Sequence, residues 1–242
     1  MPTPEETLRR LAVTFTASDI MVPREQLVCG KSEMTAAKLS LENPDFSVIP
    51  IQRRSQLTGY FERDSGKSKR IALRDLTSDG TSLLDLVEIL ECREFCFVLS
   101  HSRISGYVHY SDLNHELVKL SFYVMLEALE RAALASIEQR LTEPDFLNQN
   151  LTESRLLQVK RAYKRAGDAG RGLVSYLNVA DILRLAVNAG AMLLEESDIV
   201  AIKDVRDGAA HVSENLVRSY DDVKKLAHVR RKCLQMIGSG SG

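Results

Sequence analysis

The spacing of hydrophobic and polar positions changes once along the chain, at about residue 115. Before this point, short β-branched and aromatic runs alternate with short amphipathic segments, which is typical of mixed α/β structure. These runs predict strands over 47–51, 57–61, 95–99 and 104–110. After it, apolar residues recur every three or four positions and predict helices, over 113–141, 153–166, 173–189, 192–211 and 221–237. We therefore expect an α+β region over 1–114, an all-α helical bundle over 115–237, and a flexible GSGSG linker over 238–242.

The first region contains an internal duplication. Four residues of one copy correspond at one constant offset to four of the other, namely Met34, Ala37, Leu41 and Phe46 to Leu83, Leu86, Leu90 and Phe95. In each copy an amphipathic helix leads into a strand, a polar turn, and a second strand that begins LTGYF or ISGYV. The two copies are expected to bury their apolar faces against each other. In the helical region, one apolar stripe of the helix over 173–189 is expected to face a core, formed by Leu173, Leu177, Ala180, Leu183 and Val187.

Composition restricts the possible partners and compartments. The 32 basic and 33 acidic residues nearly cancel, so any contact with nucleic acid must come from a local patch. The four cysteines form no CxxC pair and are expected to be reduced, partly buried thiols, namely Cys29, Cys92, Cys96 and Cys233. Since the N-terminus is charged and no window approaches the ~20 apolar residues of a membrane span, we expect a soluble cytoplasmic protein.

The motifs DIMVP, FSVIPI, LTGYF, SLLDLVEIL, FCFVL and ISGYVHYSDLN resemble, in their order and doubling, a tandem pair of CBS domains over about residues 14–114. The resemblance implies a regulatory adenine nucleotide such as AMP or ATP. In this family a G-x-x-T-x-x-D run ends the nucleotide pocket, and here it reads Gly106-Tyr-Val-His109-Tyr-Ser-Asp112. The resemblance thus implies that Asp112 binds the ribose hydroxyls and that His109 replaces the threonine near the phosphates. Ser111 and Thr81 complete the implied contacts.

Two interpretations of these residues stay open. Asp112 also fits a helix cap, because aspartate is favoured near helix starts. His109 also fits a solvated strand histidine, although a protonated imidazole could donate to phosphate. In the first half, Ser65 takes the position that matches Asp112, with Asp64 one residue early. We therefore expect at most one good nucleotide site.

The helical region carries the segment VRDGAAH, residues 205–211, on the expected helix over 192–211. On a helix, Asp207 and His211 lie on one face, close enough to hydrogen-bond. Arg206 lies on the flank, and Gly208 with the two alanines leaves the surface open. Histidine can move a proton near neutral pH, and arginine can bind phosphate oxygens in a bidentate manner. These groups suit metal-independent cleavage of RNA, where the 2′-hydroxyl is the nucleophile, so DNA is not an expected substrate.

The same segment resembles the R-x(4 to 6)-H signature of HEPN domains. Arg206 and His211 match it, Ala210 falls at a usually small position, and Asp207 stands where asparagine is more common. The resemblance covers about residues 113–237 and implies a homodimer whose two motifs form one composite ribonuclease site. We expect Arg206, Asp207 and His211 to be catalytic, with no metal and no catalytic cofactor. The alternatives are a nucleotide-responsive binding protein with a degenerate bundle, and a plain dimeric scaffold.

Other segments carry weaker signals. The basic run over 160–165, with Tyr163 as a stacking platform, suits an RNA backbone, although such a run also fits a solvated helix face. Five basic residues of the last helix could add to it, namely Lys224, Lys225, Arg230, Arg231 and Lys232. GDAGRG (167–172) lacks the ending of a phosphate-binding loop and is expected to be a flexible connection. The combined expectation is a nucleotide-controlled endoribonuclease suited to host defence or toxin-like growth control.

Overall fold

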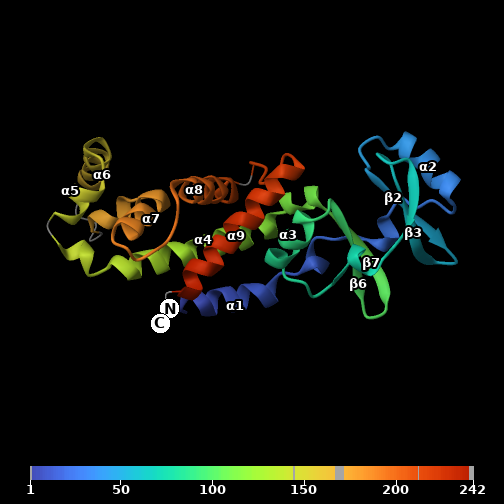
Figure 1. Ribbon diagram of the computed structural model, residues 1–242, viewed down its shortest axis with the longest axis horizontal. Helices are drawn as coiled ribbons and strands as arrows, with labels where there is room; N and C mark the ends of the chain where they lie inside the picture. The colour runs from blue at the N-terminus through green and yellow to red at the C-terminus, as the bar shows by residue number, and fades with distance from the viewer. Residues whose placement is uncertain (1, 144, 167–171, 212, 240–242) are drawn as a thin grey trace. The chain divides into compact units, whose positions relative to one another are not determined.

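The computed structural model describes residues 2–143, 145–166, 172–211 and 213–239 (Figure 1). Its contacts divide the chain into two compact units, Val13–Leu117 and Met1–Ala12 together with Val118–Gly242. We call them the sheet unit and the helical unit. The expected order, a mixed region followed by a helical one, is confirmed, although helix α1 (Pro4–Thr14) begins in the helical unit. The domain boundaries expected at 114 and 237 stay predictions.

The sheet unit contains two β-sheets. The three-stranded sheet has the order β2-β3-β4, with β2 (Val48–Arg53), β3 (Gln56–Glu62) and β4 (Lys67–Arg70). The four-stranded sheet has the order β1-β7-β6-β5, with β1 (Val22–Pro23), β7 (Arg103–His109), β6 (Phe95–Ser100) and β5 (Leu76–Ser78). Only β5 and β6 pair in parallel among these strands.

The four strands expected from sequence are β2, β3, β6 and β7, and all are confirmed. The other three strands are two to four residues long, and β4 has the sequence KSKR, which offers no apolar alternation to detect. Two helices complete the unit, α2 (Glu33–Glu42) and α3 (Leu83–Glu91), with four short 3₁₀ helices, η1 (Ala17–Asp19), η2 (Arg24–Gln26), η3 (Leu73–Asp75) and η4 (Tyr110–Asn114).

The duplication is visible in the β-hairpins. The β2–β3 hairpin has a register shift between Ile51 and Gln52, and the β6–β7 hairpin has one between Val98 and Leu99. The two shifts lie 47 positions apart in the chain (98 − 51). The same irregularity at the same place in both ladders indicates one structural unit used twice.

The helices follow a different offset, so the single constant offset expected from sequence was wrong. The serine caps of α2 and α3, Ser32 and Ser82, lie 50 positions apart (82 − 32). The outcome is visible in exposure: Met34 and Leu41 are 81% and 83% exposed, whereas their expected counterparts Leu83 and Leu90 are buried. The segment from Thr77, which pairs with Val98, to Ser82 is three residues longer than that from Gly30, which bridges Ile51, to Ser32. This insertion moves the helix register relative to the hairpin.

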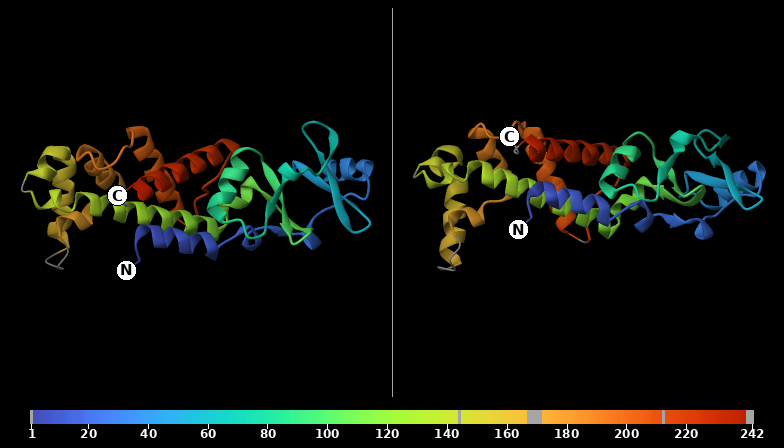
Figure 2. Two further views of the ribbon diagram at one scale, coloured as in Figure 1. Left: turned by 60° about the horizontal axis from the view of Figure 1, so that its bottom comes forward. Right: turned by 90° about the horizontal axis from the view of Figure 1, so that it is seen from below.

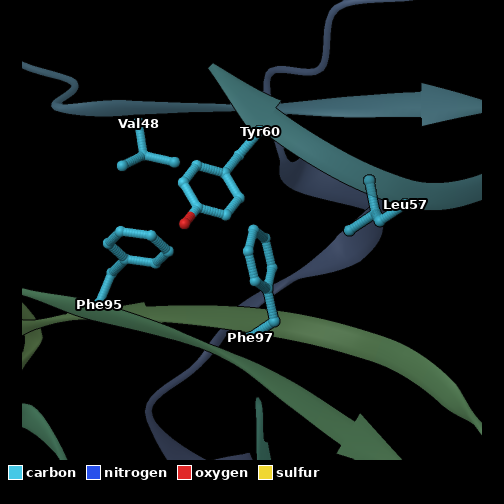
Figure 3. Packing of buried hydrophobic residues seen from close by; sticks show 5 residues of the cluster. All are labelled: Val48, Leu57, Tyr60, Phe95 and Phe97. Atoms are coloured by element: carbon cyan, nitrogen blue, oxygen red, sulfur yellow. The ribbon is translucent and has the colours of Figure 1, made fainter. Parts of the chain in front are cut away.

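The two copies pack on each other through an aromatic cluster (Figure 3). Val48, Leu57 and Tyr60 come from the first hairpin, and Phe95 and Phe97 from the second. The rings of Tyr60 and Phe95 meet edge to face, with centroids 5.1 Å apart. Aromatic pairs of this geometry add about 1 kcal/mol beyond their area burial. The expectation that the copies bury their apolar faces against each other is confirmed.

The helical unit consists of α1 and six further α-helices among the described residues, with two 3₁₀ turns. Their bounds are α4 (Glu116–Ile137), η5 (Arg140–Thr142), α5 (Phe146–Asn150), α6 (Glu153–Arg165), η6 (Leu173–Tyr176), α7 (Val179–Asn188), α8 (Glu196–Ala210) and α9 (Tyr220–Ser239). In Figures 1 and 2, α1 (blue) runs beside α4 (green), and Arg131 of α4 donates to the Thr7 hydroxyl over 3.2 Å. Within the described ranges, none of these helices is long and apolar enough to span a membrane.

The helix expected over 173–189 is divided. Leu173 belongs to η6, and the Asn178 side chain caps α7 by accepting from the Asp181 N–H over 2.9 Å. The cap ends the stripe expected to begin at Leu173, because an N-cap residue has extended backbone. Helix α9 runs through Ser239, so residues 238 and 239 of the expected linker are helical. Residues 240–242, and 167–171 of the expected flexible connection, lie outside the described residues.

Two buried carboxylates tie the helices together. Asp181 of α7 accepts from Arg155 Nε and Nη2 over 2.9 and 2.7 Å, which joins α6 to α7. Asp198 of α8 contacts His228 Nε2 at 2.7 Å and Lys232 Nζ at 2.9 Å, which joins α8 to α9. Such charge-assisted bonds are about twice as strong as neutral ones. The Asp198 contacts fix α8, which carries Arg206 of the second candidate site, against α9.

Candidate functional site

The first candidate site lies in the sheet unit, at the end of β7. Asp112 in η4 accepts the backbone N–H of His109 over 2.8 Å. His109, Ser111 and Asp112 line one cavity of about 460 Å³. This volume falls within the range of small-molecule sites. The structure therefore brings together three of the four residues expected to bind a nucleotide.

The rest of this cavity is largely apolar. Its walls come from the β1–η2 segment, from the start of β2 and from the end of β7, and include Val22, Leu27, Val28, Phe46, Pro50, Tyr107 and Tyr110. A flat aromatic base can be buried against such walls, with Asp112 as a hydrogen-bond acceptor in the lining. The cavity thus has the apolar and polar parts that a nucleoside requires.

Burial sets the protonation of the polar groups. It lowers the pKa of His109 below its ordinary value of 6.5, so the expectation of a protonated imidazole is not supported at neutral pH. Nδ1 lies 2.8 Å from the Ser111 hydroxyl and accepts the Ser111 N–H over 3.3 Å; with Nδ1 as the acceptor in both contacts, the neutral ring carries its proton on Nε2. Burial also raises the pKa of Asp112, opposed by the hydrogen bond from His109 N–H.

Thr81 does not line this cavity. Its hydroxyl bonds the Thr77 hydroxyl over 2.9 Å, and its carbonyl accepts the Ala17 N–H over 2.8 Å. Both contacts hold the loop that leads into α3. Thr81 therefore belongs to that loop and is not among the residues that line the cavity with Asp112.

A second cavity of about 540 Å³ corresponds to the first through the duplication. Asp75 lines this cavity, and its carboxylate accepts the Ala72 N–H over 2.8 Å and caps η3 as Asp112 caps η4. Ser65, which lies 47 positions before Asp112, and Asp64 line the same cavity, and the expected match of Asp112 to Ser65 stays a prediction.

The second cavity is poorly suited to an anion. Four carboxylates line it against two guanidinium groups, namely Glu62, Asp64, Asp75 and Glu94 against Arg74 and Arg93. Burial raises the pKa of Glu94, and the neighbouring charges of Asp64 and Glu62 raise it further. A phosphate would meet the same repulsion.

The second candidate site surrounds Arg206 on α8. Its guanidinium lies 5.8 Å from the centroid of the Tyr123 ring, and Nη2 is 3.8 Å from Glu127 Oε1. Arg206 Nε is buried and has no hydrogen-bond partner among the described residues. Sequence reasoning missed Tyr123 and Glu127, because they lie on α4, about 80 residues earlier in the chain. The side chain is held on the surface of α4 with part of its hydrogen-bonding capacity unused.

The expected pairing of Asp207 with His211 was wrong. Helix α8 ends at Ala210, and His211 follows it in an extended conformation, with φ −106° and ψ 113°. The four-residue helical spacing is therefore lost, and Asp207 instead pairs with Lys203 at 2.7 Å. His211 is exposed at the helix end.

Gly208 does not form an open surface as expected. It is buried, and a Cβ at this position would lie 3.3 Å from Leu216 Cδ2. The chain after His211 returns over α8 here, and the Lys119 side chain holds it by donating to the Glu214 carbonyl. The glycine thus allows the return segment to pack on α8 next to His211.

Of the two basic segments, only α6 presents unpaired charge. Lys160, Arg161, Lys164 and Arg165 are exposed and have no hydrogen-bond or ion-pair partner in the part of the chain that the structure describes. In α9, Lys224 pairs with Asp221, Lys225 with Asp204 and Lys232 with Asp198. The suggestion that α9 adds free positive charge is therefore not supported.

Metal ligands and cysteine thiols are not gathered into a site among the described residues. Within the described ranges, no group of three or more histidine, cysteine or acidic side chains could hold a metal ion. The four cysteines are free. Burial raises the pKa of Cys96 to about 12, so this thiol stays protonated and unreactive. Cys92 is exposed, unlike the partly buried thiol expected.

Comparisons with known proteins bear on about half of the chain. No protein-family model and no curated protein matches it. The CBS domain of the bacterial CNNM/CorC family Mg²⁺ transporter in complex with ATP is 17% identical with a TM-score of 0.36, covering 48% of this chain and 97% of that chain. The same domain with the inhibitor IGN95a is 17% identical with a TM-score of 0.36, covering 49% and 86%. The HEPN resemblance stays a prediction.

Proposed function

We propose that the protein is a metal-independent endoribonuclease, active as a homodimer and controlled by an adenine nucleotide that binds the sheet unit. The observation that carries the regulatory half is the cavity that joins Asp112 and His109 to an apolar slot. The observation that carries the catalytic half is the exposed His211, five positions after an arginine whose buried Nε has no hydrogen-bond partner among the described residues. The two halves are tested separately.

The first cavity accounts for adenosine binding through three kinds of contact. The base lies against the apolar walls, the ribose hydroxyls donate to the ionised Asp112, and the neutral His109 donates from Nε2 to a phosphate oxygen. The four carboxylates of the second cavity oppose a phosphate there. One adenine nucleotide per chain follows.

The catalytic proposal assigns one step to each group. Neutral His211 accepts the proton of the RNA 2′-hydroxyl, whose oxygen attacks phosphorus while the bond to the 5′-oxygen breaks. The leaving 5′-oxygen takes a proton from the imidazolium of His211 of the partner subunit. The products are a 2′,3′-cyclic phosphate and a 5′-hydroxyl. Arg206 stabilises the additional negative charge on the phosphorane oxygens.

A homodimer supplies what one chain lacks. The reaction uses both a general base and a general acid, and each VRDGAAH segment carries one histidine. In the helical unit the other histidine, His228, bonds the buried Asp198 and serves the fold. Two copies of His211 around one phosphate provide both roles.

Control by nucleotide runs through α4. This helix begins at Glu116, four residues after Asp112, and carries Tyr123 and Glu127, which hold Arg206. A nucleotide that binds one arrangement of the sheet unit more tightly biases the position of α4 by that difference in affinity. A change at α4 alters the contacts that orient Arg206.

The competing function is a nucleotide-responsive binding protein with a non-catalytic helical unit. The pairing of Arg206 with Glu127 and of Asp207 with Lys203 favours it, because both contacts satisfy charge within one chain. An RNA cleavage assay with and without AMP and ATP separates the two. We expect His211→Ala to abolish cleavage while His101→Ala, an exposed histidine of the sheet unit, leaves it unchanged. No cleavage by the unmodified protein with either nucleotide would support the binding function.

A further inference from the structure

A third cavity of the sheet unit, of about 530 Å³, lies at the turns of the two hairpins. Its polar lining comes from η2, from the two turns and from the start of β3, and consists of Arg24, Arg54, Ser55, Gln56, Thr58, Ser102 and Arg103. None of these residues lines the cavity that contains Asp112. The third cavity is therefore separate from the proposed adenine site.

The charged side chains that line this cavity are all positive. Three guanidinium groups line it, from Arg24, Arg54 and Arg103, and no carboxylate appears among its lining residues. The cavity around Asp75, in the same unit, has four carboxylates. Since the whole chain is nearly neutral, three arginines without an acid represent a local positive field.

The arginines are arranged for use by a ligand. Arg24 donates from Nη2 to the carbonyl of Ser55, which fixes its guanidinium against the turn. The side chains of Arg54 and Arg103 have no hydrogen-bond or ion-pair partner in the described ranges. One donor group is thus pre-positioned, and two keep all five of their N–H donors free.

The turn that carries Arg54 is conformationally unfavourable. Arg54 has φ 46° and Ser55 has φ 63°, both in the left-handed region. Asn-Gly is the favoured pair for a two-residue hairpin turn of this type, and each non-glycine residue held there has a strained backbone. Strain of this kind clusters at ligand-binding positions. The sequence thus has an arginine at a position where asparagine would make the hairpin turn less strained.

The floor of the cavity is apolar. Leu57 is buried, and the partly buried Ile71, Leu76, Leu99 and Ile104 surround it. Apolar walls lower the local dielectric constant and strengthen the attraction between guanidinium and phosphate groups. A cavity of this volume holds a ligand larger than one phosphate ion.

We infer that this cavity binds a phosphate-bearing anion with more than one phosphate group, held by Arg24, Arg54 and Arg103. The binding is independent of RNA cleavage and of the adenine site at Asp112. Arginine matches phosphate oxygens in a bidentate manner, and three such groups neutralise several negative charges. The same chemistry is offered by inorganic polyphosphate and by the phosphate chain of a nucleotide.

Calorimetric titration of the full-length protein with inorganic tripolyphosphate tests the inference, because this probe has no base and no ribose. We expect one saturable site, weakened about tenfold or more by Arg54→Gln and by Arg103→Gln, since each removes hydrogen bonds to a charged group. The matched control is Arg53→Gln, which removes the same charge from the same turn at a residue outside the lining. The control and Asp112→Asn are expected to keep the affinity unchanged.

Two outcomes overturn the inference. One is the absence of saturable tripolyphosphate binding to the unmodified protein at millimolar concentrations. The other is an equal loss of affinity in Arg53→Gln and Arg54→Gln, which would indicate attraction by net charge alone. Circular dichroism and thermal unfolding of each variant show that the hairpin is folded, so that a lower affinity reports on the cavity.

A second arm distinguishes the sources of the phosphate. In Asp112→Asn, where the adenine site is impaired, ATP and tripolyphosphate are compared. Equal affinities would show that the cavity recognises the phosphate chain alone. An ATP affinity higher by tenfold or more would show that it binds a nucleotide whose base reaches the apolar floor. Because neither measurement uses RNA, failure of this inference is distinguishable from failure of the nuclease proposal.

Discussion

The carboxylate of Asp112 accepts a hydrogen bond from the backbone N–H of His109 over 2.8 Å. The proposed ribose ligand is therefore also the cap of η4, and the two interpretations of Asp112 are compatible. The bond uses one of the carboxylate's lone-pair positions and leaves others for a ligand. It also fixes the position of the side chain in the cavity before any ligand binds.

The pH dependence of adenosine binding follows from this burial. Burial raises the pKa of Asp112, so the acid becomes protonated at a higher pH than an exposed aspartate. Only the ionised form accepts from both ribose hydroxyls, and adenosine affinity should fall as the pH decreases toward this raised pKa. Adenosine is the correct probe because it has no phosphate that would respond to His109. Titration at several pH values checks this, and Asp112→Asn should bind about tenfold more weakly with no such pH dependence.

The turn at Arg54 and Ser55 predicts a conflict between stability and binding. Replacement of both residues, Arg54→Asn with Ser55→Gly, gives the pair favoured for two positive φ angles and should stabilise the protein by about 1 kcal/mol. The Ser55 carbonyl that accepts from Arg24 is retained, since it belongs to the backbone. Urea unfolding and tripolyphosphate titration of this double variant measure the two effects. Unchanged anion affinity would remove Arg54 from the proposed site.

The buried Asp198 predicts an acid-sensitive contact between α8 and α9. Burial alone would raise the pKa of Asp198, but hydrogen bonds from Lys232, Glu195 N–H and His228 outweigh it and hold the pKa below its ordinary value. A lowered folded-state pKa contributes stability that is present above the unfolded-state value and is lost as the pH falls through the folded-state value. Asp198→Asn should therefore reduce the free energy of unfolding by about 2 kcal/mol at pH 7, and by less in acid.

The control for this prediction is another acid of the same helix. Asp204 pairs with Lys225 at 2.8 Å, but both side chains are largely exposed. Asp204→Asn should change the free energy of unfolding by less than about 1 kcal/mol. Similar losses in the two variants, measured by urea unfolding at pH 7, would contradict the role assigned to Asp198.

The unpaired charge on α6 predicts where RNA contacts the helical unit. Neutralising the four exposed cations to glutamine should weaken single-stranded RNA binding and reduce its salt dependence, by up to about 0.7 in slope for each phosphate that the protein no longer neutralises. These residues are Lys160, Arg161, Lys164 and Arg165. Tyr163, whose ring meets Tyr176 edge to face at 6.0 Å, is also exposed and should contribute by stacking.

A charge-matched variant controls for net charge. It replaces two lysines and two arginines that are exposed in the sheet unit, namely Lys31, Arg53, Lys67 and Arg70. Fluorescence anisotropy with labelled RNA over a range of salt concentrations compares the two variants. Equal reductions in slope would show that α6 has no special role, whereas His211→Ala should retain RNA binding.

Local sequence patterns were sufficient for the elements with apolar alternation or helical spacing. The hairpin strands and the long helices α4, α6 and α9 follow from the sequence, because their side chains repeat with the period of the structure. The two- to four-residue strands did not follow, since their pairing is determined by distant partners. Strand β5, for example, is defined by its parallel pairing with β6.

The same distinction between local sequence patterns and contacts with distant residues applies to the candidate sites. His109, Ser111 and Asp112 are neighbours in the chain, and their shared cavity was predictable from one motif. Arg206 was recognisable by its spacing to His211, but the ring and the carboxylate that hold it come from α4. The helix was expected to end at His211, one residue after its observed end at Ala210, and this single residue removes His211 from the helical spacing to Asp207.

The three-residue insertion before α3 has a consequence for the history of the two copies. At equivalent positions, 50 residues apart, α3 buries Leu86 and Leu90 where α2 buries Ala36 and Ser40. A chain assembled from two first copies would leave a void and a hydroxyl where α3 has leucine side chains. The two repeats are therefore not interchangeable. A recombinant chain with two first copies would have an incompletely packed core.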